Sequence, residues 1–472
     1  MALFRKKKKR DDDDDEDDIP RNKRRGRDDD DDDDDDNDKD DEDKKNADLV
    51  MFGGSTNGVE ANLSKNARLA EAGLVPAKHF VTDAITRRAE RFRIDPKGKV
   101  SSVRMYIDGL RYDGGRMPGR ESLAIIQMLK LLAGLDIKEK KIKQSGGVFA
   151  EFEKVKYILS VESAPTKSGA ESISIRVTDL TNRPEKPEEL GFPETIQEVI
   201  QGYSGGRKGV LIACGPPGSG TTSTRFGILR TIDAFIYSVF SIANTEHRDT
   251  TIITPYDTSN DDDFEMSVAK LKRIEADVLL LDPLTDAQVA KNLFQQHNQL
   301  CYVTEITDAD SAAGIMKLIE WVEDPKMVGE GIDAILSQKL IRALCDKCKD
   351  AFRPSPKLID KVGLPLETRV LYRALKPPTE FDDEEEEDDD EEEYVPCEKC
   401  HGVGFYGRTA MYEMIEMTDS MKELILSDSV DANAIRKQAR KEGMVTFAKE
   451  AIRLVAEGKT SLEEVQKTFR KK

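Results

Sequence analysis

A glycine-rich run holds the clearest chemistry in this sequence. Gly215-Pro-Pro-Gly-Ser-Gly-Thr-Thr222 follows an apolar stretch and precedes a helical pattern, which is where a phosphate-binding loop lies. Glycines there let backbone N–H groups wrap phosphate oxygens, and the helix N-terminus adds a favourable dipole. The residues expected to line a nucleotide phosphate site are Gly215, Gly218, Ser219, Gly220, Thr221 and Thr222.

The loop departs from the pattern G-x-x-x-x-G-K-[ST] at one position. Thr221 stands where a lysine contacts the β- and γ-phosphates, whereas Thr222 supplies the hydroxyl expected on Mg²⁺. Losing one charge-assisted contact costs about 1.5–3 kcal/mol, or about 10- to 150-fold in affinity. Two interpretations stay open: weak binding of ATP with Mg²⁺, and an empty turn inherited from a nucleotide-binding ancestor.

Carboxylates that could act on a phosphate are scarce. Asp282 ends an apolar run, but Pro283 follows where a second acidic residue is wanted. Glu246 is the only carboxylate near the end of the preceding predicted strand. Asp282 and Glu246 are therefore weak catalytic candidates, and a structural or solvent-facing role is favoured for each.

Four cysteines form two Cys-x-x-Cys pairs, Cys345 with Cys348 and Cys397 with Cys400. Four thiolates satisfy a tetrahedral Zn²⁺ completely, which predicts a closed structural site. The pairs lie further apart than usual, but the acidic run 380–393 between them suits an exposed loop. The alternative is that the cysteines are reduced and bind no metal.

The elements around these motifs predict an α/β protein. Apolar strands are expected at 209–214, 237–244, 277–282 and 300–306, separated by helices such as 221–235, and four further helical segments after Gly329. Such alternation is typical of a parallel sheet with helices on both faces. Upstream, a smaller α+β unit is expected, with helices at 79–92 and 121–135, a pair of strands around Asp108-Gly109 within 100–112, and a strand at 171–180.

Composition divides the chain of 472 residues further. Residues 1–48 hold 14 basic and 23 acidic side chains, and 13 of the 14 residues in 380–393 are acidic. These two segments carry net charges of −9 and −13, so the rest of the chain has a net charge of +3 while the whole chain has −19. Blocks of like charge predict disorder. The expected order is a charged tail (1–48), a linker (49–79), the α+β domain (80–180), a linker (181–195) and the core (196–472).

Some function classes are disfavoured. No stretch approaches the roughly 20 apolar residues of a membrane-spanning helix, and no signal peptide is recognised, so we expect a cytoplasmic protein. Direct nucleic-acid binding is not expected, because no basic stripe with interleaved aromatic residues is present.

The order of these motifs resembles the motor ATPases of type II secretion and type IV pilus assembly. The resemblance covers about 80–468 and is most specific in "QKLIRALCDKCKDAF" (338–352), "CEKCHGVGFYGRTAMYEM" (397–414) and "ARKEGMVTFAKEAIRLVAEGKTSLEEV" (439–465). It implies a RecA-like P-loop domain after a smaller α+β domain, a structural Zn²⁺, and a hexameric ring that works with inner-membrane platform proteins. Arg176, in "SISIRVTD", resembles an arginine that reaches the nucleotide from the preceding domain.

The chain departs from that family at four signature positions. Thr221 replaces the lysine, Ala243-Asn244 an acidic pair, Asp282-Pro283 a Gly-Glu pair, and Ile306 a histidine. Three hypotheses follow. The favoured one is a catalytically impaired, structural or regulatory subunit of a homo- or hetero-hexamer. The others are an active ATPase that uses Asp282, Glu246 and Arg176, and a scaffold that forms no ring.

Overall fold

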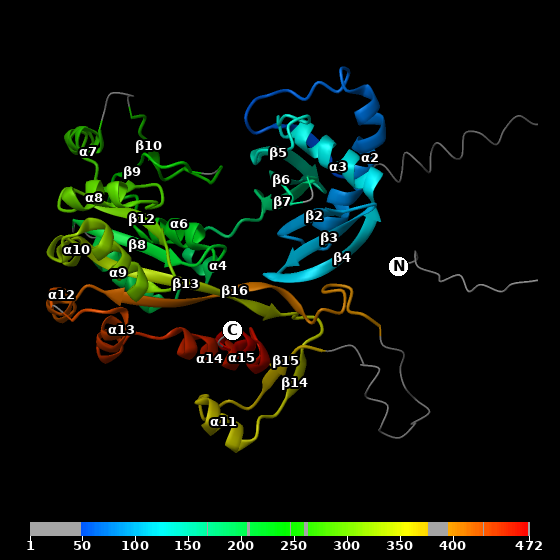
Figure 1. Cartoon of the computed structure of the whole chain (residues 1–472). Helices are drawn as coiled ribbons and strands as arrows, with labels where there is room; N and C mark the ends of the chain where they lie inside the picture. Colours follow the sequence, from blue (N-terminus) through cyan, green and yellow to red (C-terminus); the bar gives the residue numbers. More distant parts are fainter. Residues whose placement is uncertain are drawn as a thin grey trace, which may run out of the picture. The chain divides into compact units, whose positions relative to one another are not determined.

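The structure is a computed structural model of the chain. It describes residues 49–167, 169–204, 208–245, 247–258, 263–375, 395–427 and 429–470. The expected charged tail (1–48), the acidic run (380–393) and Glu246 lie outside the described residues. Figure 1 shows the arrangement of the helices and strands.

The N-terminal domain is a seven-stranded antiparallel sheet with two helices on one face. Its strand order is β1-β5-β6-β7-β2-β3-β4. The strands are β1 (Met51–Ser55), β2 (Arg91–Lys97), β3 (Val100–Ile107), β4 (Leu110–Pro118), β5 (Gln144–Phe152), β6 (Val155–Pro165) and β7 (Glu171–Asp179), and the helices are α2 (Ala67–Thr86) and α3 (Gly119–Leu132). One hydrophobic core joins both helices to the sheet. The strand pair expected around Asp108-Gly109 is confirmed, since β3 and β4 pair on either side of that turn.

The segment expected to be a linker, 49–79, contains regular structure. β1 pairs with β5, and the segment's second half forms most of α2. Gly73 and Pro76 resemble helix breakers in sequence, but both lie inside this helix. A Cβ atom on Gly73 would lie 2.8 Å from the carbonyl oxygen of Ala124 in α3. This glycine therefore permits a close approach of two helices and does not end one.

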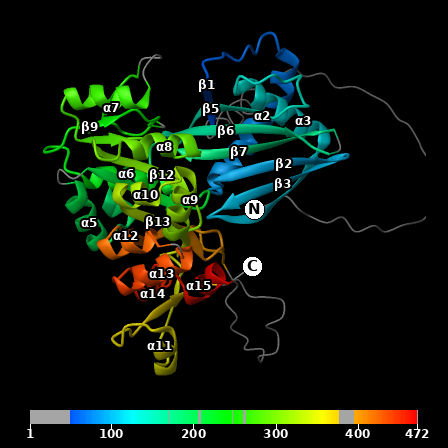
Figure 2. The same cartoon turned by 60° about the vertical axis from the view of Figure 1, so that its left-hand side comes forward.

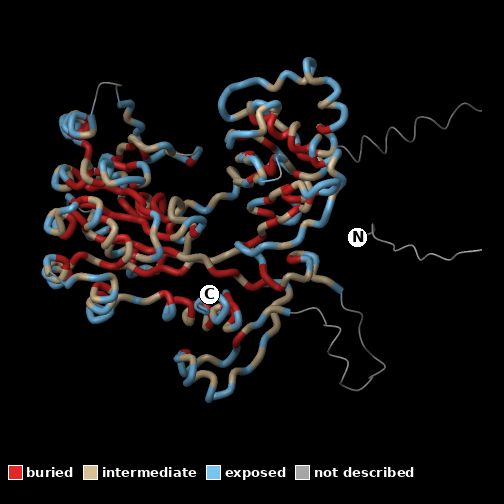
Figure 3. Tube along the Cα trace, viewed as in Figure 1, coloured by how far each residue is buried: buried red, intermediate tan, exposed pale blue. Residues whose placement is uncertain are grey.

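The core is a second seven-stranded sheet, with strand order β10-β9-β11-β12-β8-β13-β16. Neighbouring strands are parallel from β10 to β13, and β16 is antiparallel to β13. The strands are β8 (Gly209–Gly215), β9 (Val239–Ser241), β10 (Thr254–Pro255), β11 (Val278–Leu280), β12 (Cys301–Thr307), β13 (Ile332–Leu344) and β16 (Phe405–Glu416). Every residue of β8 is buried, and Figure 3 shows the buried residues concentrated along this sheet. The expected parallel α/β architecture is confirmed.

Helices cover both faces of the core sheet, as Figure 2 also shows. One face packs against α7 (Phe264–Arg273), α8 (Ala287–Gln295), α9 (Ser311–Val322), α10 (Pro325–Gly331), α12 (Asp419–Ile425) and α13 (Ala432–Lys441). The other packs against α5 (Glu194–Ser204) and α6 (Thr221–Thr231). Five further elements share a smaller hydrophobic core, namely β14 (Asp350–Phe352), α11 (Pro356–Val362), β15 (Leu371–Arg373), α14 (Phe447–Ala456) and α15 (Leu462–Phe469).

Helical segments were expected after Gly329 and are present, but the strands β13 and β16 in the same region were not predicted. β13 and β16 are the longest strands of the core sheet and pair along most of their length. Polar residues such as Ser337, Gln338 and Glu413 interrupt their apolar pattern, yet all three are buried. The pattern therefore lacked the alternation that identifies a half-exposed strand.

The expected linker 181–195 also packs on the core. It contains α4 (Pro187–Leu190) and the start of α5. The hydroxyl of Tyr412 donates to the carbonyl of Leu190 at 2.9 Å, and the rings of Phe192 and Tyr412 are 4.9 Å apart. Among the described residues, no helix is both long enough and apolar enough to cross a membrane.

Candidate phosphate loop and metal centre

The glycine-rich run forms a tight loop between β8 and α6, and the structure brings its six predicted residues together. Gly218 and Gly220 have φ angles of 80° and 92°, a conformation that glycine adopts without steric cost. The amide of Ser219 donates to the carbonyl of Pro216 at 3.1 Å. This is the strand–loop–helix geometry that surrounds phosphates in P-loop proteins.

Strand β13 braces the loop from one side. The side-chain amide of Gln338 donates to the carbonyl of Ser219 at 2.7 Å. Cβ atoms placed on Gly215 or Gly220 would lie 2.8 Å from the carbonyl oxygen and 2.7 Å from the amide nitrogen of Gln338, respectively. These two glycines are therefore required by packing inside the protein.

Thr221, at the lysine position, directs its hydroxyl back into the loop. Its Oγ1 lies 3.0 Å from the Oγ of Ser219. A threonine side chain carries no charge and is too short to reach outward like a lysine. The loop therefore has the backbone shape of a phosphate site but no cation at this position.

Thr222 contacts a carboxylate that the sequence analysis missed. Its hydroxyl donates to Oε1 of Glu305 in β12 at 3.0 Å. Oε2 of Glu305 lies 3.5 Å from Nε of Arg225 in α6. Glu305 is the one charged residue of β12, which is buried from Cys301 to Ile306. That charge within a buried strand was the available signal.

Asp282, which follows β11, contacts both β12 and the segment after β9. Its Oδ1 accepts the amide of Asn244 at 3.0 Å, and its carbonyl accepts the hydroxyl of Thr304 at 2.8 Å. These contacts give Asp282 a structural role in the described residues. Arg176 is exposed on β7, where its sheet neighbours are Arg91 and Ser160.

The two cysteine pairs come together into one cluster. The sulfur atoms of Cys345, Cys348, Cys397 and Cys400 all lie within 4.8 Å of one another. The Cys345–Cys397 and Cys348–Cys400 sulfur distances are 3.9 Å and 3.5 Å. Four sulfurs about 2.3 Å from a tetrahedral Zn²⁺ would be about 3.8 Å apart. The donor set and its spacing therefore fit a metal ion.

Backbone amides and ion pairs support this cluster. The amide of Gly404 donates to the sulfur of Cys400 at 3.3 Å. Amides of Cys400 and Lys399 lower the pKa of the Cys397 thiol to about 7, whereas burial raises the pKa of the Cys345 and Cys348 thiols. Two ion pairs, Lys347 with Glu398 and Lys399 with Asp346, connect the cysteine turns across the cluster.

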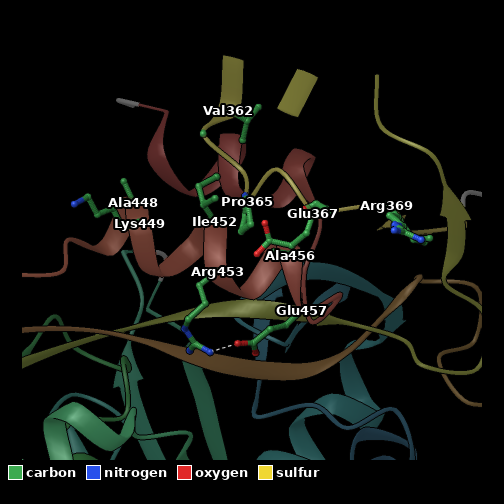
Figure 4. A pocket seen from close by; sticks show the side chains of 13 residues that line it. Val362, Pro365, Glu367, Arg369, Ala448, Lys449, Ile452, Arg453, Ala456 and Glu457 are labelled. Atoms are coloured by element: carbon green, nitrogen blue, oxygen red, sulfur yellow. Dashed lines mark hydrogen bonds and ion pairs between the residues drawn. The ribbon is translucent and has the colours of Figure 1, made fainter. Parts of the chain in front are cut away.

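A groove lies apart from both candidate sites, between α14 and the segment that follows α11. Its volume is about 900 Å³, and Figure 4 shows its apolar residues, including Ile452 and Pro365, together with charged side chains such as Arg453 and Glu457. None of its lining residues belongs to the phosphate loop or the cysteine cluster. The volume of a groove therefore does not identify the candidate functional site in this protein.

The fold and the loop define a RecA-like P-loop protein with an added four-cysteine module. The sequence matches the family described as Type II/IV secretion system protein over residues 72–467, and the chain belongs to this family. The X-ray structure of the ATPase DotB from Legionella pneumophila has a similar fold, with a TM-score of 0.52, 14% identity, and coverage of 82% of this chain and 92% of that chain.

Curated relatives include the type IV pilus assembly ATPase PilB of Thermus thermophilus, 25% identical over 82% of this chain and 42% of that protein. The Pseudomonas aeruginosa PilB is 26% identical over 84% of this chain and 68% of that protein. The type II secretion system protein E of the same organism is 25% identical over 82% and 74%. The chain thus spans less than half of the Thermus relative's length.

Proposed function

We propose that the protein is a subunit of a type II secretion or type IV pilus assembly machine and turns over ATP poorly or not at all. It would act as a structural or regulatory component of a hexameric ring, alone or with active motor subunits. Its place would be the cytoplasm, at the inner-membrane platform of the machine. Membership of the secretion-system family supports the assignment to such a machine. The threonine at position 221 supports the proposal that ATP turnover is impaired.

The observation that best supports impaired catalysis is the uncharged side chain at position 221 of the loop. Thr221 turns its hydroxyl to Ser219, so no ammonium group is available there to stabilise transferring phosphate. Asp282, the acidic residue at the end of β11, is engaged by Asn244. Efficient hydrolysis needs both a cation and a positioned carboxylate.

Two measurements test this proposal on the full chain. Phosphate release with Mg²⁺ and ATP should stay at the level of a protein-free blank. Light scattering should detect a hexamer, either of this chain alone or after mixing with an active motor subunit. Turnover at a rate normal for such motors would refute the impairment, and a monomer under all conditions would favour the scaffold hypothesis.

One observation favours the alternative of an active, divergent ATPase. The Glu305 carboxylate is 3.0 Å from the hydroxyl of Thr222, so it could orient a metal-bound water. If so, the wild-type protein would release phosphate and Glu305→Gln would abolish that release. Absence of turnover in the wild-type protein removes this alternative.

We further propose that the cysteine cluster binds Zn²⁺ in a structural role. Four thiolates favour zinc over harder cations such as Mg²⁺ or Ca²⁺, and a site with four protein ligands leaves no position for a substrate. The metal would join the turn after β13 to the turn before β16, and thus close the long connection between these strands.

A further inference from the structure

The β16 pocket lies at the edge of the core sheet, where β16 is the last strand. It is lined by residues of α5 and β16 and by residues within 439–453, a segment that runs from the end of α13 into α14. Its volume is about 390 Å³, which is in the range of small-molecule sites. None of its lining residues belongs to the phosphate loop or to the cysteine cluster. It is therefore a separate candidate site.

Strand β16 gives this pocket its length. Tyr412, Met414 and Glu416 are alternate residues of the strand and point to the same face, the face on which α5 packs. At one end, the Tyr412 ring lies 4.9 Å from that of Phe192, just before α5. At the other end, Oε2 of Glu416 accepts the hydroxyl of Tyr203, near the end of α5, at 3.3 Å. Four residue steps of about 3.3 Å make the pocket about 13 Å long.

The charges at the Tyr412 end are already paired. Burial, with the charge of Glu450 adding to it, raises the pKa of the Tyr412 phenol, so Glu450 belongs to this end. The Glu450 carboxylate is buried, and its Oε2 accepts Nε of Arg453 at 3.0 Å. Arg453 also pairs with Glu457, as Figure 4 shows. This end therefore has no cation to offer an anionic ligand.

The Glu416 end carries two carboxylates whose partners are neutral. Oε1 of Glu442 accepts the hydroxyl of Thr418 at 2.9 Å and the side-chain amide of Gln438 at 2.7 Å. Because Thr418 is two residues beyond Glu416, both carboxylates lie at this end. In the described part of the chain, neither Glu416 nor Glu442 forms an ion pair with a basic side chain. The Glu416 end is therefore negatively charged.

Between the two ends the walls of the pocket are apolar. α5 contributes Ile196 and Val199, and the connection between α13 and α14 contributes Met444 and Val445. Such walls accept an aliphatic chain and disfavour a ligand that is charged along its length. A negative end selects a ligand with a positive group there, because complementary charges fix specificity.

We infer that the β16 pocket binds a small aliphatic amine, with the alkyl chain along β16 and the ammonium group beside Glu416 and Glu442. An alcohol of the same length would lack the charge-assisted contact, which is worth about 10- to 150-fold in affinity. A carboxylate of the same length would meet like charges. The inference goes beyond the proposed function and holds whether or not the protein turns over ATP.

The first experiment titrates the full-length protein with n-octylamine, 1-octanol and octanoate at pH 7 by calorimetry. These probes share an alkyl chain and differ in the group at its end. We expect one octylamine per chain, bound at least about 10-fold more tightly than octanol, and no heat from octanoate. Octylamine should also raise the melting temperature, because a ligand that binds only the folded state stabilises it.

Two variants locate the site. Glu416→Gln/Glu442→Gln keeps the hydrogen-bond acceptors but removes the charges, so octylamine should bind at least about 10-fold more weakly while octanol is unaffected. Val199→Trp fills the pocket and should abolish binding of both probes. Glu367→Gln, an exposed carboxylate in the groove of Figure 4, is the matched control and should bind octylamine like the wild type.

Two results would overturn the inference. One is octylamine that binds no more tightly than octanol, or not at all. The other is octylamine binding that is unchanged in both the charge-removing and the pocket-filling variant, which would place the ligand elsewhere. If either variant does not melt cooperatively, Glu442→Gln or Thr195→Trp, both at exposed positions of the pocket, replaces it under the same criteria.

Discussion

The side-chain amide of Gln338 lies 2.7 Å from the carbonyl oxygen of Ser219 and links β13 to the phosphate loop. Gln338 is 2% exposed and Ser219 is 6% exposed, so the Ser219 carbonyl has no ready access to replacement water. This hydrogen bond holds the loop in shape without any ligand.

Gln338→Ala should therefore lower the free energy of unfolding by about 1–3 kcal/mol, the cost of leaving a buried acceptor unsatisfied. Urea unfolding followed by circular dichroism measures this change. Gln288→Ala, at an exposed position in α8, is the control and should stay within about 0.5 kcal/mol of the wild type. Equal stabilities of the two variants would argue against the brace.

Replacement of a helical glycine by alanine should have opposite effects on stability at two positions. At Gly73 the added methyl would lie 2.8 Å from the backbone of α3, whereas at Gly202 in α5 it would meet nothing within 4 Å. Gly73→Ala should destabilise by about 1–3 kcal/mol through overpacking. Gly202→Ala should stabilise by up to about 1 kcal/mol through helix propensity. Thermal melts of both variants check the signs, and a stabilised Gly73→Ala would contradict the close packing of α2 on α3.

The cysteine cluster predicts one bound zinc per chain. Cys348→Ser should lose the metal, because three thiolates remain where four are needed for a closed site. It should also melt at a lower temperature, since metal binding and folding are coupled. Cys301→Ala, a buried cysteine in β12, should retain the zinc. Elemental analysis of the purified variants measures the zinc content per chain. One zinc per chain in Cys348→Ser would contradict a four-cysteine zinc site.

Glu413 in β16 predicts a pH dependence of stability. Burial raises the pKa of this carboxyl above its usual value of 4.5, and the charge of Asp310 adds to the rise, against the opposing effects of the Phe447 amide, Lys339 and Arg436. Because the pKa is raised in the folded state, protonated Glu413 contributes stability that is fully present below pH 4.5. That contribution is lost as pH rises through the folded-state pKa.

Glu413→Gln cannot ionise and should keep the amide contact with Phe447. Its stability relative to the wild type should therefore increase between pH 4 and pH 7. Urea unfolding at each pH measures this difference, with the exposed Glu423→Gln as control. A difference that is flat with pH, or that falls, would contradict the expectation.

The sequence was sufficient where local patterns determine the outcome. Apolar runs located β8, β11 and β12, and the spacing of Gly215 to Gly220 located the loop between a strand and a helix. The turn at Asp108-Gly109 was predicted for the same reason, since the turn itself requires such residues.

Long-range contacts explain what the sequence did not reveal. Glu305 and Arg225 are 80 positions apart, and only the parallel order of β8, β12 and β11 brings them together. Gln338 looked like an interruption of an apolar pattern because its partner, Ser219, lies 119 residues away. The role of Gly73 inside α2 depends on its contact with Ala124 in another helix, which no local pattern contains.

Strand β13 passes the loop at Gln338 and ends one residue before Cys345, so seven residue steps of about 3.3 Å separate the two candidate sites. Successive side chains of a strand point to opposite faces. One residue inserted or deleted between Gln338 and Cys345 would therefore turn every later side chain of the strand to the other face. The connection that begins at Cys348 is constrained in another way, because β14, α11 and β15 pack with α14 and α15 around Leu364, Leu371 and Val455. The number of residues between Gln338 and Cys345 should therefore stay fixed even where the residues themselves change.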